Sequence, residues 1–186
     1  MNNFIRSLSS VSKLSAECQT SLEERMKTFE FAKNQIVLRQ GQVCNYLYFV
    51  DQGLLRLFYY RAGKDITDYF ATEQSIIGGI DSFFSRLPSK KMIETLEPCR
   101  LTAISFNTLE KLYTEYHDLE RVGRLLSTAA FLSMQERLYA IQFQKAKERY
   151  DELVRNSPSL LQRAPLRHIA SYLGITQVTL SRIRGQ

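Results

Sequence analysis

The sequence has few of the residues on which metal and redox chemistry depend. Its 186 residues include three cysteines and two histidines, and no two cysteines form a CxxC pair. Cys18, Cys44 and Cys99 are therefore expected to be reduced, mostly buried thiols rather than zinc ligands or a disulfide framework. An iron–sulfur sensor is disfavoured as well, because a cluster needs about four cysteine ligands.

Long apolar runs are also missing. No run approaches the roughly 20 residues needed to cross a bilayer, and the segment from Met1 to Arg6 lacks a charged stretch followed by an apolar signal core. The sequence thus predicts a cytoplasmic protein with no membrane partner. Hydrophobic residues make up 44% and charged residues 24%, which is ordinary globular usage and enough for a packed core.

The C-terminal segment lacks acidic residues. After Glu152 there is no Asp or Glu, and the net charge of the whole chain is +6. Five arginines fall in this segment: Arg155, Arg163, Arg167, Arg182 and Arg184. The positive excess is therefore concentrated there and favours a polyanionic partner, with a merely solvated basic face as the alternative.

The order of the expected helices and strands along the chain indicates an α+β fold. Residues 7 to 28 indicate short N-terminal helices, with Ser15 and Ser21 available as caps. Short segments rich in β-branched and aromatic residues follow, with turn signals between them: Gln35 to Arg39, Tyr46 to Val50, Leu54 to Tyr60, Ile66 to Phe70 and Arg100 to Ser105. With no helical pattern expected until about residue 106, they predict an antiparallel β jelly-roll barrel within a first domain of residues 1–116.

One long helix is expected over residues 117–144. Leu119, Val122, Leu126, Ala129 and Ser133 follow 3–4 spacing, and a second apolar row lies beside them. Because a helix that covers only its own barrel needs one stripe, the wide face predicts packing against a second copy in a two-fold homodimer. A helix buried between two domains of one chain is the alternative. A charged helix over residues 145 to 157 opens the third domain, residues 145–186.

The stretch from Leu166 to Arg184 has the features of a helix-turn-helix. Ala170 supplies the small residue where two helices cross, and Gly174 permits the left-handed backbone of a tight turn. Thr176 can cap the second helix. Five inward apolar residues lock the two helices together: Ile169, Leu173, Ile175, Leu180 and Ile183.

The outward residues of the second helix are candidates for contact with double-stranded DNA. In this motif the second helix enters the major groove with its N-terminal residues nearest the base edges. Gln177 could then pair with adenine, Arg182 with guanine, and Val178 could touch a thymine methyl. The remaining candidates are Thr176 and Ser181 on the same face, and, for phosphates, Arg167, Thr179 and Arg184.

With barrel, long helix and helix-turn-helix in that order, the whole chain resembles the Crp/Fnr superfamily of cyclic-nucleotide-binding-like transcription regulators. Residues 148 to 153, 165 to 176 and 180 to 184 look especially like the branch common in Bacteroidetes. The resemblance implies a homodimer on a pseudo-palindromic operator, with recognition helices about 34 Å apart. RNA polymerase is a further candidate partner, through the terminal helices. Two residues follow Arg184, so the β-hairpin wing of many relatives is not expected.

The resemblance also locates a ligand loop, in which this sequence departs from the family. In members that bind cyclic AMP, a Glu holds the ribose and an Arg holds the phosphate. Here Gly79 stands in place of the Glu and Ser89 in place of the Arg. Losing both groups should remove much of the affinity for cyclic AMP. Lys90 or Lys91, with the backbone of Gly78 and Gly79, could still meet another anion, so an effector of unknown identity remains open. The alternative is that these lysines are solvated and the glycines serve a barrel turn.

Two other classes of function compete with a DNA-binding regulator. An enzyme built on the barrel, as in cupins, would need a His and carboxylate cluster on the strands, yet His117 and His168 both fall in the helical half. A haem sensor would have to use one of the same two residues, so haem is disfavoured and no enzyme is expected. The other class is a ligand-sensing or scaffolding dimer that binds a protein through its terminal helices.

Overall fold

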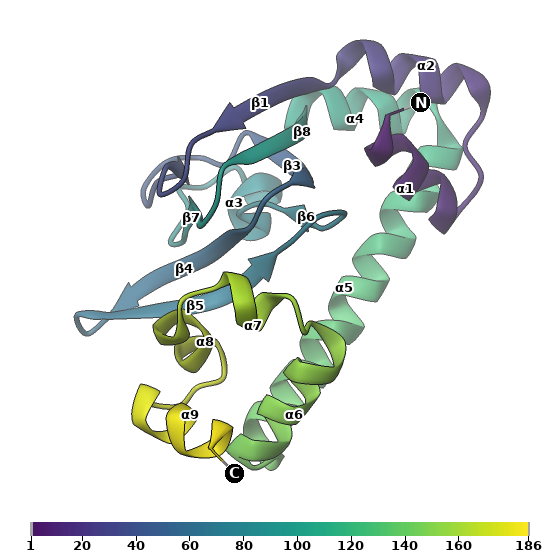
Figure 1. The fold of residues 1–186 in the computed structure, drawn as a ribbon. Coiled ribbons are helices and arrows are strands. Elements are labelled where there is room, and N and C mark those ends of the chain that lie inside the picture. Colours follow the sequence, from purple (N-terminus) through teal and green to yellow (C-terminus); the bar gives the residue numbers. More distant parts are fainter. Residues whose placement is uncertain (1, 186) are drawn as a thin grey trace.

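The chain folds into a β-barrel with helices at one end, a long helix beside it, and a group of short helices that packs on one of its sheets (Figure 1). The computed structural model describes residues 2–185. The predicted α+β architecture is confirmed, because the three parts follow one another in the expected order.

The barrel consists of two antiparallel sheets, which in the described part of the chain have four strands each. Their strand orders are β1-β8-β3-β6 and β2-β7-β4-β5. The strands are β1 (Lys27–Phe31), β2 (Ile36–Leu38), β3 (Tyr46–Gln52), β4 (Leu55–Arg61), β5 (Lys64–Ala71), β6 (Ile76–Ile77), β7 (Met92–Thr95) and β8 (Cys99–Ser105). This jelly-roll-like arrangement confirms the predicted fold class, and the five predicted strand segments correspond to β2, β3, β4, β5 and β8.

One expectation for the barrel region is wrong, and three strands were not among the segments named from the sequence. Residues 29 to 105 were expected to hold strands without a helix, but α3 (Ile80–Ser85) interrupts them. Its six residues are too few for a helical period to show in the sequence, and burial of Phe83 in the barrel core holds it in place. The strands β1, β6 and β7 were not predicted either; β1 and β6 lie at sheet edges, and β7 has only four residues.

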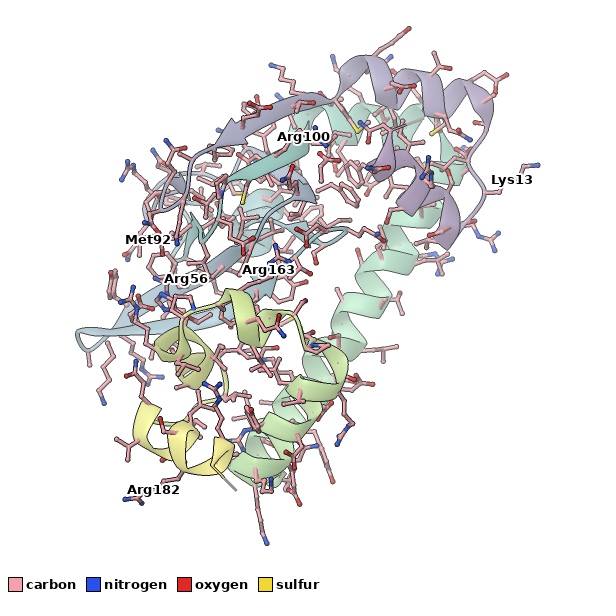
Figure 2. All side chains as sticks on the ribbon, viewed as in Figure 1. Lys13, Arg56, Met92, Arg100, Arg163 and Arg182 are labelled. Atoms are coloured by element: carbon pink, nitrogen blue, oxygen red, sulfur yellow. The ribbon has the colours of Figure 1, made fainter. Side chains whose placement is uncertain are left out.

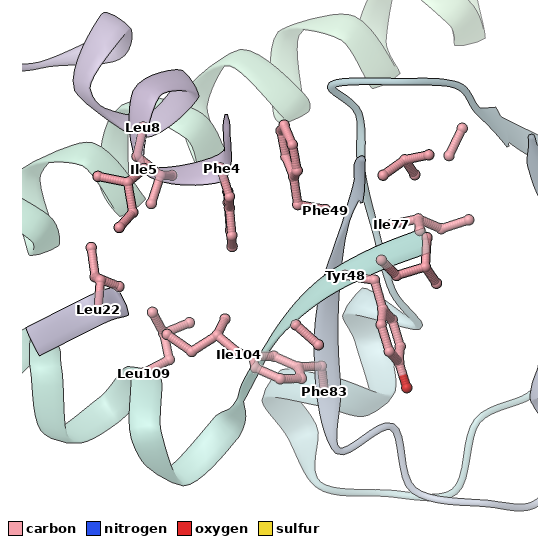
Figure 3. Packing of buried hydrophobic residues seen from close by; sticks show 14 of the residues in the cluster. Phe4, Ile5, Leu8, Leu22, Tyr48, Phe49, Ile77, Phe83, Ile104 and Leu109 are labelled. Atoms are coloured by element: carbon pink, nitrogen blue, oxygen red, sulfur yellow. The ribbon is translucent and has the colours of Figure 1, made fainter. Parts of the chain in front are cut away.

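The N-terminal helices α1 (Asn3–Val11) and α2 (Ala16–Arg25) close one end of the barrel core, as Figure 3 shows. Phe4 stacks on Phe49 of β3 with ring centroids 4.9 Å apart. The predicted helices and the Ser15 cap are confirmed, since the Ser15 hydroxyl accepts a hydrogen bond from the Cys18 amide at 3.3 Å. Ser21 is not a cap, because it lies buried within α2.

The long helix α5 (His117–Phe143) follows α4 (Phe106–Glu115) and extends beyond the barrel (Figure 1). Leu119 and Val122 are buried against the barrel core. Gly123 packs closely on α4, since a Cβ there would lie 2.3 Å from the Tyr113 hydroxyl and force that side chain to move. The second half of α5 is uncovered and carries large exposed apolar side chains: Phe131, Leu132, Met134, Leu138, Tyr139, Ile141 and Phe143.

The C-terminal helices are α6 (Ala146–Asn156), α7 (Leu160–Arg163), α8 (Leu166–Tyr172) and α9 (Gln177–Arg184). They share a second hydrophobic cluster, in which Leu153, Ile169 and Leu180 are buried. Leu54 and Phe70 of the barrel belong to the same cluster. The C-terminal helices therefore pack directly on the outer face of the sheet that contains β5.

Candidate nucleic-acid interface

The helices α8 and α9 form the predicted helix-turn-helix. Ala170 is 2% exposed and lies where the two helices meet. Its carbonyl accepts a hydrogen bond from the Ile175 amide at 2.9 Å, and Gly174 between them has φ +68°. This left-handed conformation favours glycine because it has no Cβ. A Cβ at this glycine would meet no neighbour within 4 Å, so backbone conformation rather than space requires it.

The second helix begins at the expected cap. The Thr176 side chain accepts a hydrogen bond from the Thr179 amide at 3.1 Å, and the two hydroxyls are 2.9 Å apart. A cap of this kind satisfies one of the free amides in the first turn of a helix. Of the five inward residues, Ile169, Leu173 and Leu180 are buried, and Ile175 and Ile183 are half-buried.

The outward residues of the motif form an uncovered surface on α9 and at the start of α8. Those that are exposed are Arg167, Thr176, Gln177, Val178, Ser181, Arg182 and Arg184; Thr179 is half-buried beneath its capping contact. Within residues 2–185, Arg182 and Arg184 make no ion pair. Figure 2 shows Arg182 at the lower edge of the molecule, pointing away from the barrel. The arrangement offers amides, hydroxyls and guanidinium groups, all donors that suit an anionic surface.

One arginine of the acid-free segment is used differently. Arg163 pairs with Glu97 at 2.6 Å and with Glu73 at 2.8 Å, both on the barrel side. The hydrogen bond from Arg163 lowers the pKa of Glu73 to about 2. The charge of Arg163 therefore joins the C-terminal helices to the barrel. The expectation that every arginine after Glu152 adds to a basic surface is wrong for this residue.

His168 also joins the two parts of the molecule. It is 4% exposed, and its Nδ1 lies 2.9 Å from the Arg56 guanidinium of β4. Burial and then the charge of Arg56 lower the pKa of His168 to about 4. We assign Nδ1 as the acceptor; a neutral imidazole has one acceptor nitrogen, so the Arg167 Nε at 3.2 Å from Nε2 does not make a second hydrogen bond.

The ligand loop brings Gly79 and Ser89 together. A Cβ at Gly79 would lie 3.2 Å from the Ser89 hydroxyl and 2.9 Å from a methyl group of Leu38. Gly78 and Gly79 are both buried, and Ser89 is 2% exposed. The Ser89 hydroxyl donates to the Lys91 carbonyl at 2.9 Å and accepts from the Lys91 amide at 3.1 Å. The Ser89 hydroxyl is thus engaged within the loop, and a side chain at position 79 would require the Leu38 methyl group to shift.

The two lysines of this loop, Lys90 and Lys91, differ in exposure and in pairing. Lys90 is exposed, and the Lys91 ammonium pairs with Asp68 of β5 at 2.7 Å. Asp68 also contacts Arg137 of α5, whose guanidinium lies 4.6 Å above the Tyr172 ring of α8. The loop is therefore connected through β5 to the long helix and the helix-turn-helix.

Several residues that position the interface were not identified from the sequence. Arg56, Ser171 and Arg137 connect the helix-turn-helix to the barrel. A charged residue in the middle of an apolar strand was the available signal for Arg56, since burial of a charge requires a partner. Among residues 2–185, no three His, Cys, Asp or Glu side chains gather as a metal site. No helix of that part is both long and apolar enough to span a membrane.

The comparisons with known proteins agree with this architecture. Residues 28–116 match a family model described as cyclic nucleotide-binding domain. Comparison with curated protein sequences finds no match. Among solved structures, the chain is similar to the Thermus thermophilus Catabolite Activator Protein, with 17% identity, 96% of this chain and 85% of that chain covered, and a TM-score of 0.61.

Two further structures have a higher TM-score of 0.70. FixK2 from Bradyrhizobium japonicum is 19% identical, with 87% of this chain and 83% of that chain covered. A protein from Eubacterium rectale described as a transcriptional regulator of the Crp/Fnr family is 17% identical, with 91% and 82% covered. Residues 28–116 thus match the cyclic nucleotide-binding domain model, and the whole chain has the fold of the solved Crp/Fnr structures. The Bacteroidetes branch stays a prediction.

Proposed function

We propose that the protein is a sequence-specific, DNA-binding transcription regulator that acts as a homodimer on a pseudo-palindromic operator. The observation that carries this proposal is the outer face of α9, which is exposed, free of acidic residues and capped at the end that would enter the major groove. Arg167 and Arg184 at its margins suit phosphates, while Gln177, Val178, Ser181 and Arg182 suit base edges.

Selection of bound sequences from random DNA by the purified protein tests the proposal. We expect a palindrome whose half-sites are about one helical turn apart. The affinity should fall steeply as salt rises, because phosphate contacts release counterions. A protein that binds no DNA, or whose partner is a protein held by apolar contacts with little salt dependence, would refute the proposal.

Arg182 provides the residue-level test. Arg182→Ala should weaken binding to the selected operator by about 1 to 3 kcal/mol and relax specificity at one base pair. Its matched control is Arg155→Ala on α6, another exposed arginine that lies outside the helix-turn-helix. Equal operator affinity of Arg182→Ala and wild type would show that this side chain does not read a base.

The dimer is proposed from the uncovered half of α5. Seven large apolar side chains between Phe131 and Phe143 are at least half exposed, which is a costly surface to leave in water. Their continuity along one helix suits the same helix of a second copy, related by a two-fold axis.

We further propose that cyclic AMP is not the effector. Gly79 offers no acceptor for a ribose, and Ser89 offers neither a positive charge nor a free hydroxyl. Haem and iron–sulfur control are disfavoured on the same kind of argument, since His168 is engaged by Arg56 and the three cysteines lie apart in the core. Titration calorimetry with cyclic AMP should show no binding at micromolar concentration.

A further inference from the structure

The hairpin of β4 and β5 ends in a rigid, positively charged tip. Ala62 and Gly63 form its two-residue turn with φ +49° and +75°. Positive φ at both central residues defines a type I′ turn, which matches the twist of the strands and holds the tip in one conformation. The flanking residues, Arg61 and Lys64, are the last paired residues of the hairpin.

This hairpin is joined to the helix-turn-helix. The Ser171 hydroxyl of α8 accepts a hydrogen bond from the Thr67 amide at 2.9 Å and donates one to the Asp65 carbonyl at 3.1 Å. Arg56 of β4 adds its contact with His168 of α8. Because these bonds involve the hairpin backbone and buried side chains, the tip keeps a defined position relative to α8 and α9.

The two charges at the tip are free. Arg61 and Lys64 are exposed, and neither makes an ion pair or side-chain hydrogen bond within residues 2–185. The nearest acidic residue in the sequence, Asp65, is engaged by the Arg56 guanidinium at 2.5 and 2.8 Å. Within residues 2–185, no acidic side chain forms an ion pair with either tip residue.

The tip lies outward of the recognition helix. Figure 1 shows α5 on one side of α8 and α9 and the tip of the β4–β5 hairpin on the other. If α5 lies at the dimer axis, DNA that runs through α9 and away from this axis continues past the tip. In that arrangement, Arg61 and Lys64 would lie on the side toward which the DNA flanking each half-site continues.

We propose that the β4–β5 hairpin tip is a second DNA-binding site, at which Arg61 and Lys64 contact phosphates of the duplex outside the half-site. The inference rests on the proposed function. We assign the contacts to the backbone because the tip presents two cations on long, exposed side chains, which suit phosphate oxygens. Bending of the flanking duplex toward the barrel brings the phosphates within reach, and the added ion pairs offset the cost of bending.

The test compares two lengths of the operator selected by the wild-type protein. The short duplex ends at the outer edges of the half-sites, and the long one continues by about one helical turn on each side. The variant Arg61→Ala/Lys64→Ala removes the tip charges. The control Lys13→Ala/Arg100→Ala removes two exposed charges at positions that Figure 2 shows far from α9.

On the long duplex, the tip variant should bind about tenfold more weakly than wild type at 0.1 M salt. The slope of log affinity against log salt should decrease by roughly 3 to 4, at about 0.9 for each of the four phosphate contacts of a dimer. On the short duplex, wild type and tip variant should bind equally, and the control should match wild type on both. The variant Arg61→Lys/Lys64→Arg keeps the charges and should restore affinity for the long duplex.

Several outcomes would overturn the inference. Equal affinity of wild type and tip variant for the long duplex, an equal loss on both duplexes, or an equal loss in the control would each do so. Thermal unfolding of the tip variant should match wild type because both positions are exposed, so a lost fold cannot imitate the expected result. If the wild-type protein binds DNA and the tip variant binds it equally well, only this inference fails. If the wild-type protein binds no DNA, the proposed function fails as well.

Discussion

At the scale of single residues, the two histidines have opposite surroundings. The His117 side chain is 92% exposed beside Glu120, with 3.5 Å between Nδ1 and Oε2. His168 is buried and accepts from Arg56, so it is held neutral. Protonation of His168 would place a positive charge against a buried guanidinium and remove one of the acceptors that join the barrel to the helix-turn-helix.

This contrast predicts a specific loss of stability in acid. The pKa of His168 is lowered to about 4 in the folded protein, whereas it is about 6.5 in the unfolded chain. Between pH 6.5 and pH 4 the unfolded chain therefore binds a proton that the folded protein does not, and the free energy of unfolding falls as the pH falls. We expect a loss of about 2 to 3 kcal/mol between pH 7 and pH 4.5 from this group.

Urea unfolding at the two pH values measures the effect in wild type, His168→Gln and His117→Gln. The pH dependence should be smaller by this amount in His168→Gln and unchanged in His117→Gln. If all three proteins lose the same free energy of unfolding, His168 does not titrate in the way that its surroundings indicate.

At the scale of elements, the helix-turn-helix depends on the backbone of one glycine. Gly174 has φ +68°, whereas Gly185 at the end of α9 has φ −87°. Both glycines are exposed and unobstructed, so they differ in backbone conformation and not in space for a side chain. Gly174→Ala should destabilise the protein by about 1 to 2 kcal/mol because a Cβ is unfavourable in the left-handed region. Gly185→Ala should be nearly neutral. Thermal unfolding and operator affinity of both variants check this, and equal behaviour would show that the turn adapts to a side chain.

The elements also show which patterns can be predicted from sequence. The long helix, the helix-turn-helix and strands such as β4 have enough residues for a period and distinct signals at their ends. The helix α3 and the strand β7 have six and four residues. Each of them is held in the barrel by a few buried residues, among them Phe83 in α3 and Ile93 in β7. Contacts with the rest of the barrel, not local pattern, decide these short elements.

At the scale of the whole molecule, the exposed half of α5 predicts how two chains assemble. The variant Met134→Glu/Leu138→Glu places two negative charges on the uncovered apolar face, where burial against a second copy would desolvate them. We expect wild type to sediment as a dimer of the 21.6 kDa chain and this variant as a monomer.

The control Thr20→Glu/Thr28→Glu adds the same charge at exposed positions on α2 and β1 and should remain dimeric. A dimer that persists in Met134→Glu/Leu138→Glu would place the contact between chains elsewhere. Operator affinity should fall together with dimerisation, because each half-site then contributes alone.

The sequence alone determined the parts of this protein whose signals are local. The small Ala170, the left-handed Gly174 and the Thr176 cap lie within seven residues, so their spacing was sufficient to predict the helix-turn-helix and its outward face. Only the tertiary structure decided how that motif is joined to the barrel. Arg163 is separated from Glu97 by 66 residues, and Arg56 from His168 by 112. No periodic pattern connects such distant positions; burial of the shared cluster brings them together, and it also packs α8 on β5.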